Sequence, residues 1–178
     1  MITGEHVGLR AIEEGDLETL LRWRNRPDYR TYFREVRELS MADQRRWYHE
    51  VVLTSPAVRM FAITTPDNAR LLGACGLCYI DPVRRSADFS IYIGAEDLYI
   101  DDVYAPEAGR LLLNYGFQEM NLHRIWAEIY DHDTRKQALL PDLGFTLEGR
   151  LKDHHFTNGQ FVDSLMYGQI SPYSSTQK

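Results

Sequence analysis

Three side chains that can move protons stand two residues apart between residues 86 and 94. Asp88 carries a carboxylate, Ser90 a hydroxyl and Tyr92 a phenol. Alternate residues of a β-strand point to the same face, so this spacing places all three on one surface. We therefore predict that Asp88, Ser90 and Tyr92 carry out general acid–base chemistry. The alternative is structural: a carboxylate paired with an arginine, and a packed aromatic ring.

Cys75 and Cys78 have the CxxC spacing of zinc and redox sites. They fall within a predicted strand, where residues three apart face opposite ways, and no second pair of ligands has suitable spacing. The sequence therefore predicts no metal site and no redox function. By the same alternation, the adjacent His154 and His155 point to opposite faces. They could line one site together only if a bulge intervened.

The bulk composition is that of a soluble globular chain. It has 178 residues, 44% of them hydrophobic, two cysteines and a formal net charge of −6. Such a length suits one domain with a hydrophobic core, which we expect over residues 1–170, followed by a tail over 171–178. The negative charge gives no general attraction to nucleic acid, and no apolar run approaches the roughly 20 residues that span a bilayer. We expect a cytoplasmic protein with neither nucleic-acid nor membrane partners.

The pattern of apolar residues and of turn residues predicts the elements that must position these side chains. We expect strands over 7–12, 58–64, 71–80, 86–94, 124–130, 145–151 and 161–169, and helices over 16–25, 40–53, 107–120 and 134–143. Ser40 with Asp43 forms a near capping box, Gly144 suits a helix C-cap, and Asn158-Gly159 suits a hairpin turn. The antiparallel middle followed by strand–helix alternation predicts a mixed sheet flanked by helices, in the α/β (α+β) class.

Several of these segments, taken in order, resemble one known family. They include Arg22-Trp23-Arg24-Asn25, the strand over 85–94, Asn121-Leu122-His123-Arg124-Ile125 and Leu143-Gly144-Phe145. Over residues 7–170 the chain resembles the GNAT acyltransferase superfamily, and within it the ribosomal-protein-alanine acetyltransferase branch. The resemblance implies a central mixed sheet whose fourth and fifth strands splay apart. It also implies acetyl-CoA, or another acyl-CoA, as co-substrate.

In that family the pantetheine lies between the splayed strands and pairs with the fourth strand's backbone, and the diphosphate lies on amides at the start of the third helix. The resemblance therefore implies cofactor contacts at Ile91, Tyr92, Ile93, Tyr104, Ala105, Arg110, Asp133 and Lys136. Asn25 and Arg26, in the loop after the first helix, would contact the acceptor. Asp88 would take the proton of the acceptor amine, because related enzymes often carry a glutamate there. Tyr92 would be a substitute donor of a proton to the departing thiolate.

The chain departs from the family at two places. The phosphate loop of the family is rich in glycine, whereas residues 98–106 contain none, and Asp101 and Asp102 stand where the family has a glycine and a basic residue. Two carboxylates repel a diphosphate. Leu140 replaces the tyrosine that commonly protonates the CoA thiolate. Arg110, Arg135 or Lys136 could supply the missing positive charge.

The resemblance leads us to expect an N-acyltransferase, in particular an N-acetyltransferase, that acts on a primary amine. The acceptor classes left open are a protein N-terminus, an amino sugar nucleotide, and a small amine such as a polyamine. The arginines of the first two helices favour an anionic or nucleotide-linked acceptor, and a homodimer is expected from the family. The alternative is a degenerate member of the fold that binds a ligand without acetyl-CoA catalysis or uses another acyl donor.

Overall fold

The fold is organised around one mixed sheet of eight strands, in the order β1-β2-β3-β4-β5-β6-β8-β7. The computed structural model describes residues 1–173. The strands are β1 (Ile2–Thr3), β2 (Gly8–Ala11), β3 (Arg59–Thr64), β4 (Leu71–Asp81), β5 (Ser86–Ile93), β6 (Arg124–Tyr130), β7 (Thr146–Thr157) and β8 (Gln160–Ile170). The helices are α1 (Leu17–Arg24), α2 (Pro27–Arg30), α3 (Met41–Trp47), α4 (Tyr104–Asn114) and α5 (Thr134–Asp142). The predicted mixed sheet flanked by helices is confirmed.

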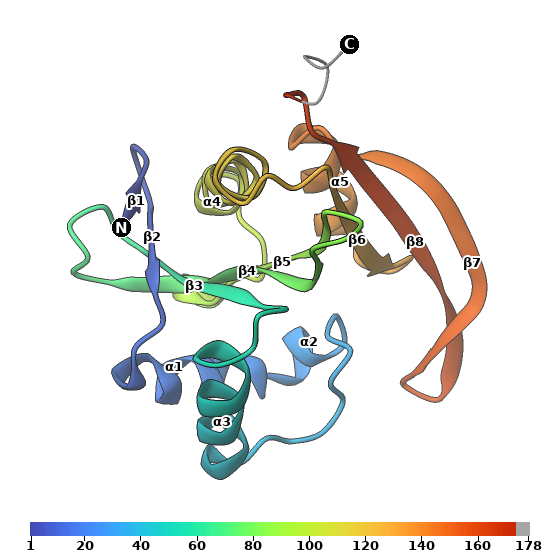
Figure 1. Ribbon diagram of the computed structural model, residues 1–178. Coiled ribbons are helices and arrows are strands. Elements are labelled where there is room, and N and C mark those ends of the chain that lie inside the picture. The colour runs from blue at the N-terminus through green and yellow to red at the C-terminus, as the bar shows by residue number, and fades with distance from the viewer. Residues whose placement is uncertain (174–178) are drawn as a thin grey trace.

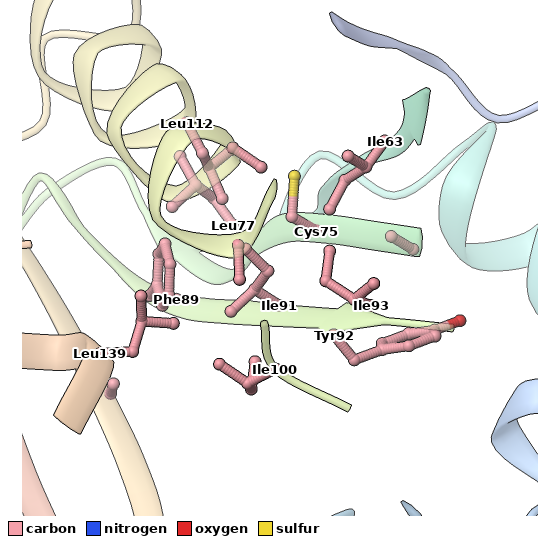
Figure 2. Close-up of a cluster of buried hydrophobic side chains, with 14 of the residues drawn as sticks. Ile63, Cys75, Leu77, Phe89, Ile91, Tyr92, Ile93, Ile100, Leu112 and Leu139 are labelled. Carbon is pink, nitrogen blue, oxygen red and sulfur yellow. The ribbon is translucent and has the colours of Figure 1, made fainter. Parts of the chain in front are cut away.

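Helices cover both faces of the sheet. Helix α4 lies over one face, and α1, α2 and α3 lie against the other (Figure 1). Under α4 the core is apolar: Leu112 of the helix gathers with Leu77 of β4 and with Ile91 and Ile93 of β5 (Figure 2). Each of these four side chains is at most 1% exposed. Burial of this face leaves the opposite face of β5 for polar side chains, because alternate residues of a strand face opposite ways.

Strands β5 and β6 run parallel but stay paired only briefly. The pairs are Ser86 with Arg124, Ala87 with Ile125, and Asp88 with Trp126. Beyond Asp88 the two strands separate, while β6 stays paired with β8 over its whole length. The predicted splay of the fourth and fifth strands of the family fold is confirmed here as the divergence of β5 and β6.

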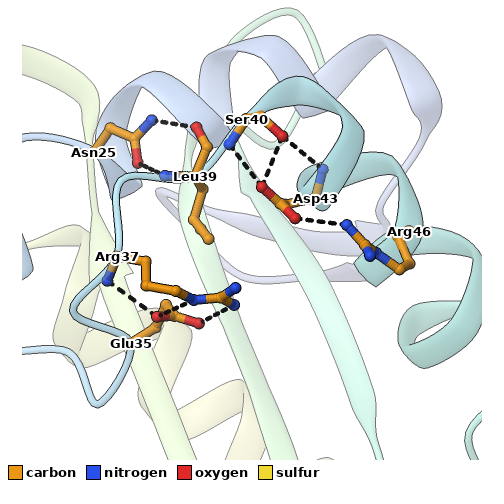
Figure 3. A network of polar contacts seen from close by, with 7 residues as sticks. All are labelled: Asn25, Glu35, Arg37, Leu39, Ser40, Asp43 and Arg46. Atoms are coloured by element: carbon orange, nitrogen blue, oxygen red, sulfur yellow. Dashed lines mark hydrogen bonds and ion pairs between the residues drawn. The ribbon is translucent and has the colours of Figure 1, made fainter.

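The local signals of the sequence form the structures expected of them. The amide of Asp43 donates to Ser40 Oγ at 3.1 Å and the amide of Ser40 donates to Asp43 Oδ2 at 3.0 Å, which completes the capping box of α3 (Figure 3). Asn158 and Gly159 have φ angles of 49° and 81° in the turn between β7 and β8. Gly144 has a φ of 91° at the end of α5. Such positive φ angles suit glycine and asparagine.

Some elements differ from the prediction. Helix α4 begins at Tyr104 rather than at residue 107, and the sequence pattern predicts neither of the short elements β1 and α2. Strand β7 ends at Thr157 rather than at residue 151, because it continues for as long as β8 pairs with it, and periodicity does not report pairing. Strand β8 matches its prediction to within one residue at each end. Of the predicted tail, Ser171 is buried and its amide donates to the carbonyl of His123 at 2.8 Å. Residues 174–178 lie outside the described part of the chain.

A partly buried ion pair joins the start of α1 to β2. Arg10 donates to Asp16 through both of its terminal nitrogens, at 2.6 and 2.9 Å, and the amide of Glu13 also donates to Asp16, at 2.8 Å. Burial alone would raise the pKa of Asp16, but the hydrogen bond from Arg10 and the amide of Glu13 outweigh it and lower that pKa. The charged form of Asp16 is therefore favoured in the folded state.

We expect Asp16→Asn to lower the free energy of unfolding at pH 7 by about 1–3 kcal/mol, because it removes a charge-assisted contact from a buried site. A lowered folded pKa stabilises the protein above the unfolded value of about 3.9 and loses that effect as pH falls through the folded pKa. The difference between the two proteins should therefore shrink below about pH 4. Urea unfolding at pH 7 and pH 3 measures it, with the exposed Glu18→Gln as control.

Candidate active site

The divergence of β5 and β6 opens a cavity of about 480 Å³, here called the splay cavity. Asp88 and Ser90 from β5 line it, together with Glu128 and Tyr130 from β6. Partners in a parallel pair share a face, so the pairing of Asp88 with Trp126 places all four of these side chains on the same side of the sheet. Two carboxylates from separate strands thereby meet in one hollow.

Asp88 is the buried acid of this cavity. It is 4% exposed, and Arg34 Nη1 donates to its Oδ2 at 2.8 Å. Burial raises the pKa of Asp88, and the Arg34 guanidinium opposes that rise without cancelling it. A buried carboxyl with a raised pKa is a stronger proton acceptor than a solvated one.

Arg34 joins the two strands through their carboxylates. Its Nη2 lies 3.6 Å from Glu128 Oε2, so one guanidinium faces Asp88 on β5 and Glu128 on β6. Its Cζ lies 5.7 Å from the ring centre of Tyr79 and 5.9 Å from that of Trp126. The segment between α2 and α3 thus delivers an internal cation to the acidic side of the cavity.

A bulge in β7 brings both adjacent histidines to β6. The register of β7 on β8 shifts between Leu151 and His155. His154 Nδ1 lies 3.2 Å from Glu128 Oε1, and the His155 ring stacks on the Tyr130 ring with centres 4.3 Å apart. The expectation that His154 and His155 face opposite sides is wrong here, because the bulge interrupts the alternation.

The structure separates Tyr92 from the other two residues of the predicted trio. Tyr92 leaves β5 on the side away from Leu112 (Figure 2), as Asp88 and Ser90 do. It lines a neighbouring cavity of about 410 Å³, here called the α3 cavity. Burial raises the pKa of Tyr92 to about 12, and that of Tyr130 also to about 12. The hydroxyl of Tyr130 is buried without a hydrogen-bond partner among residues 1–173.

Two further cations reach these cavities. Arg24 lines both, with its guanidinium carbon 4.3 Å from the ring centre of Phe33, and it forms no ion pair within the described residues. Lys136 of α5 lines the splay cavity, and its Nζ lies 5.2 Å from the ring centre of Tyr99. Burial lowers the pKa of Lys136, although the carboxylate of Asp133 opposes that effect.

The two predicted acceptor residues are engaged elsewhere. The amide nitrogen of Asn25 donates to the Leu39 carbonyl at 2.8 Å and its oxygen accepts from the Leu39 amide at 2.9 Å (Figure 3). Arg26 pairs with Asp28 and Asp97, outside both cavities. Asn25 therefore holds the segment that carries Arg34, and the structure does not bring Asn25 or Arg26 to Asp88.

Two of the predicted cofactor residues of β5, Ile91 and Ile93, have only their backbone available to a ligand. Ile91 and Ile93 bury their side chains under α4. The amide of Ile93 donates to the Tyr99 carbonyl at 2.8 Å, whereas that of Gly94 donates to Leu72 on the β4 side. Successive amides alternate in direction, so the amide of Ile91 points with that of Ile93 toward the gap beside β6. The amide of Ile93 is thus already hydrogen-bonded within the protein.

The remaining predicted cofactor residues lie on α4 and α5. Tyr104 and Ala105 begin α4, and their amides donate to the carboxylate of Asp101. Arg110 is exposed, about 9 Å further along that helix. Asp133 is buried at the start of α5, where it accepts from the Lys136 amide and from the Tyr99 hydroxyl, each at 3.0 Å. Its side chain is therefore a helix cap.

Sequence reasoning missed Arg34, Glu128 and Tyr130. Glu128 and Tyr130 alternate along the strand 124–130 as Asp88 and Ser90 do along theirs, and this was the available signal. The alternation within each strand does not show that these side chains lie on the same face of the sheet. That depends on the register between the two strands. Arg34 lies in an aperiodic segment and carries no signal of its position.

Cys75 and Cys78 face opposite sides of β4 as predicted. Cys75 is buried in the core under α4 (Figure 2), and Cys78 lines the splay cavity. Burial raises the pKa of the Cys78 thiol to about 11. Within residues 1–173 no group of three or more His, Cys, Asp or Glu side chains is placed to hold a metal ion, and no helix is long and apolar enough to cross a membrane.

Comparison with known proteins matches the sequence to the family described as "Acetyltransferase (GNAT) domain" over residues 6–146. The chain is similar to the spermidine N(1)-acetyltransferase of Vibrio cholerae serotype O1, with 28% identity over 155 residues and 87% of each chain covered. It is also 28% identical over 169 residues to an uncharacterized N-acetyltransferase, p20, of Bacillus licheniformis, with 93% of each covered. A crystal structure of the Vibrio cholerae spermidine N-acetyltransferase with CoA and spermine gives a TM-score of 0.85 at 27% identity, covering 93% of this chain and 96% of that one.

We expect Arg34→Met to destabilise the protein at pH 7 by about 1–2 kcal/mol, because Asp88 then lies buried without its ion-pair partner. The cost is smaller than for a fully buried pair, since the Arg34 side chain is 40% exposed. With the guanidinium gone the pKa of Asp88 rises further, and a raised folded pKa means stability present at low pH and lost as pH rises. The deficit should therefore be smaller at pH 5 than at pH 7.

Urea unfolding of Arg34→Met at the two pH values measures this deficit. Arg34→Met combined with Asp88→Asn removes both charges and should recover most of the lost stability. A deficit that is the same at both pH values, or that the second substitution does not relieve, would show that Arg34 stabilises the protein through packing alone.

Proposed function

The chain belongs to the acetyltransferase (GNAT) family, and from that premise we propose that it acetylates the primary amine of a small molecule whose amino group enters the splay cavity. It is an N-acetyltransferase, and acetyl-CoA is its acetyl donor. The observation that carries the proposal is the buried Asp88 beside Glu128 at the point where β5 and β6 diverge. The assignment to the ribosomal-protein-alanine branch stays a prediction.

The divergent strands suit the acyl end of the donor. Beyond Asp88, β5 has no strand beside it on the β6 side, and the amide of Ile91 points into that gap. A backbone amide that points into such a gap can hydrogen-bond a carbonyl oxygen. Acetyl-CoA supplies the thioester that an amine attacks. The residues that would hold its acyl end are Ile91, through its backbone, and Ser90, through its hydroxyl.

Asp88 would accept the proton of the acceptor amine. An ammonium group must lose a proton before its nitrogen can attack, and the carboxylate must be ionised to receive it. Arg34 assists by favouring the charged form of the buried carboxyl, through its 2.8 Å hydrogen bond, against the effect of burial on the pKa of Asp88. Arg34 is therefore a positioning residue, and Asp88 is the proposed general base.

Tyr130 and Tyr92 are the residues proposed to donate a proton to the departing CoA thiolate. With pKa values raised to about 12, both phenols keep their protons at neutral pH. Tyr130 lines the splay cavity itself, whereas Tyr92 opens to the α3 cavity, so Tyr130 is the better placed of the two. It would supply the hydroxyl that Leu140 lacks.

A polyamine is the acceptor class that the relatives support, because the similar Vibrio cholerae protein is named a spermidine acetyltransferase. Asp88 and Glu128 line the splay cavity and offer two carboxylates to an ammonium group. An amine that also carries an anionic group, such as an amino sugar nucleotide, is the second candidate. It is favoured by Arg24, which lines both cavities and forms no ion pair with any residue from 1 to 173.

The test is release of free thiol from acetyl-CoA in the presence of spermidine, an amino sugar nucleotide or a peptide with a free N-terminus. Acetylation of spermidine supports the polyamine acceptor, and acetylation of the nucleotide alone supports the anionic one. Absence of thiol release with every amine, at millimolar concentrations of each, would contradict the proposed function.

We expect Asp88→Asn to lower kcat/KM by about 10²- to 10⁴-fold, the usual contribution of a general base. In the parent, kcat/KM should rise with pH as Asp88 loses its proton, and this limb should lie above the ordinary aspartate value of about 3.9 because burial raises the pKa. The limb should vanish in Asp88→Asn. The exposed Asp142→Asn, which makes the same chemical change outside the cavities, should leave the profile intact.

A further inference from the structure

The amides at the start of α4 are already occupied by a carboxylate of the chain itself. Asp101 Oδ2 accepts from the amides of Val103 and Tyr104, at 3.0 and 2.7 Å, and its Oδ1 accepts from the amide of Ala105 at 2.7 Å. The first amides of a helix lack carbonyl partners, and the helix dipole makes them a favoured place for an anion. Here three of them converge on one side chain.

This arrangement disagrees with the chemistry of the donor. A diphosphate needs hydrogen-bond donors and positive charge, and the amides at the start of α4 would supply both. A cavity of about 410 Å³ opens at this point, and its charged side chains are the carboxylates of Glu96, Asp101 and Asp102 and the guanidinium of Arg135, with His6 beside them. The negative charges outnumber the positive one. The residues present therefore do not fit a diphosphate while Asp101 holds the amides.

We propose that Asp101 is a specificity-determining residue for the acyl donor: its carboxylate competes with the donor's diphosphate for the three amides. This inference rests on the proposed function. It follows that CoA gains little from its diphosphate in this protein, and that a donor ending at the pantetheine, without phosphate, binds about as well. Removal of the Asp101 charge leaves a weaker competitor for the amides and so restores the preference for CoA.

Asp102 provides the matched control. It carries the same charge one residue away, is exposed and lines the same cavity, but it makes no hydrogen bond to the α4 amides. Asp101→Asn and Asp102→Asn therefore remove equal charge from the cavity. Only the first removes the anion from the helix. The amide oxygen of asparagine can still accept a hydrogen bond from these amides, so Asp101→Asn should fold.

The experiment is isothermal titration of the parent, Asp101→Asn and Asp102→Asn with CoA and, separately, with pantetheine. The parent should bind the two ligands with Kd values within about threefold, since little of the diphosphate's interaction energy is realised. Asp101→Asn should bind CoA about tenfold more tightly, the scale of one charge-assisted contact, with pantetheine unchanged. Asp102→Asn should change either affinity by less than about threefold, as expected for a screened surface charge.

Thermal unfolding gives a second measurement, in which the substitution should lower the Tm of the free protein but increase the stabilisation by CoA. Asp101→Gly removes the cap, so the free protein should melt at a lower temperature than the parent, while the rise in Tm on adding CoA should be larger. A carboxylate that only caps the helix would lower the first Tm and leave the CoA-induced rise unchanged. That result would overturn the inference.

Other results also overturn it. If Asp101→Asn and Asp102→Asn lower the Kd for CoA equally, the effect comes from the net charge of the cavity and not from the contact with the amides. If the parent binds CoA far more tightly than pantetheine, Asp101 does not compete with the diphosphate. The proposed function is judged separately, by thiol release from S-acetyl-pantetheine with an amine. Turnover of that donor upholds the function whatever the titrations show, and tighter CoA binding without turnover of either donor upholds only the inference about Asp101.

Discussion

The parallel contact between β5 and β6 ends at Asp88, and the arrangement of the site follows from where it ends. Three residue pairs hold the strands together, and beyond them each strand keeps only its outer partner, β4 on one side and β8 on the other. A sheet that stayed paired would fill this space with its own ladder of hydrogen bonds. Because it separates, the face that carries Asp88 and Glu128 borders a cavity, and part of the β5 backbone faces the gap rather than a neighbouring strand.

Charged side chains of the protein itself occupy two places where a ligand could bind. At the acidic end Arg34 stands between Asp88 and Glu128, and at the start of α4 Asp101 stands on three amides. A buried carboxylate without a cation, or a helix start without an acceptor, is costly, so each contact stabilises the chain when no ligand is present. Each contact also occupies a group that a ligand of the same charge would use. Stability of the free protein and affinity for ligands are thus set against each other at the same residues.

The segment between α2 and α3 couples the acidic end to the rest of the fold. Asn25 fixes Leu39 through two hydrogen bonds, and the ion pair of Arg37 with Glu35 and the capping box of Ser40 and Asp43 hold the same stretch in place (Figure 3). These contacts position the backbone on either side of Arg34. Asn25 acts on the site through the path of the chain rather than by touching a substrate.

The amino-acid sequence by itself determined the features that depend on near neighbours. The alternation of Asp88, Ser90 and Tyr92, the capping box at Ser40 and the turn at Asn158-Gly159 each need only residues within one strand, one helical turn or one hairpin. The ordered motifs of the sequence also predicted the family and its splayed sheet. Tertiary structure alone decided that Arg34 meets Asp88, 54 residues away, and that Glu128 shares their cavity. It likewise decided that Asp101 caps a helix that begins earlier than its apolar pattern. Register, packing and the exact start of a helix are set by contacts between distant segments, and local periodicity carries no record of those contacts.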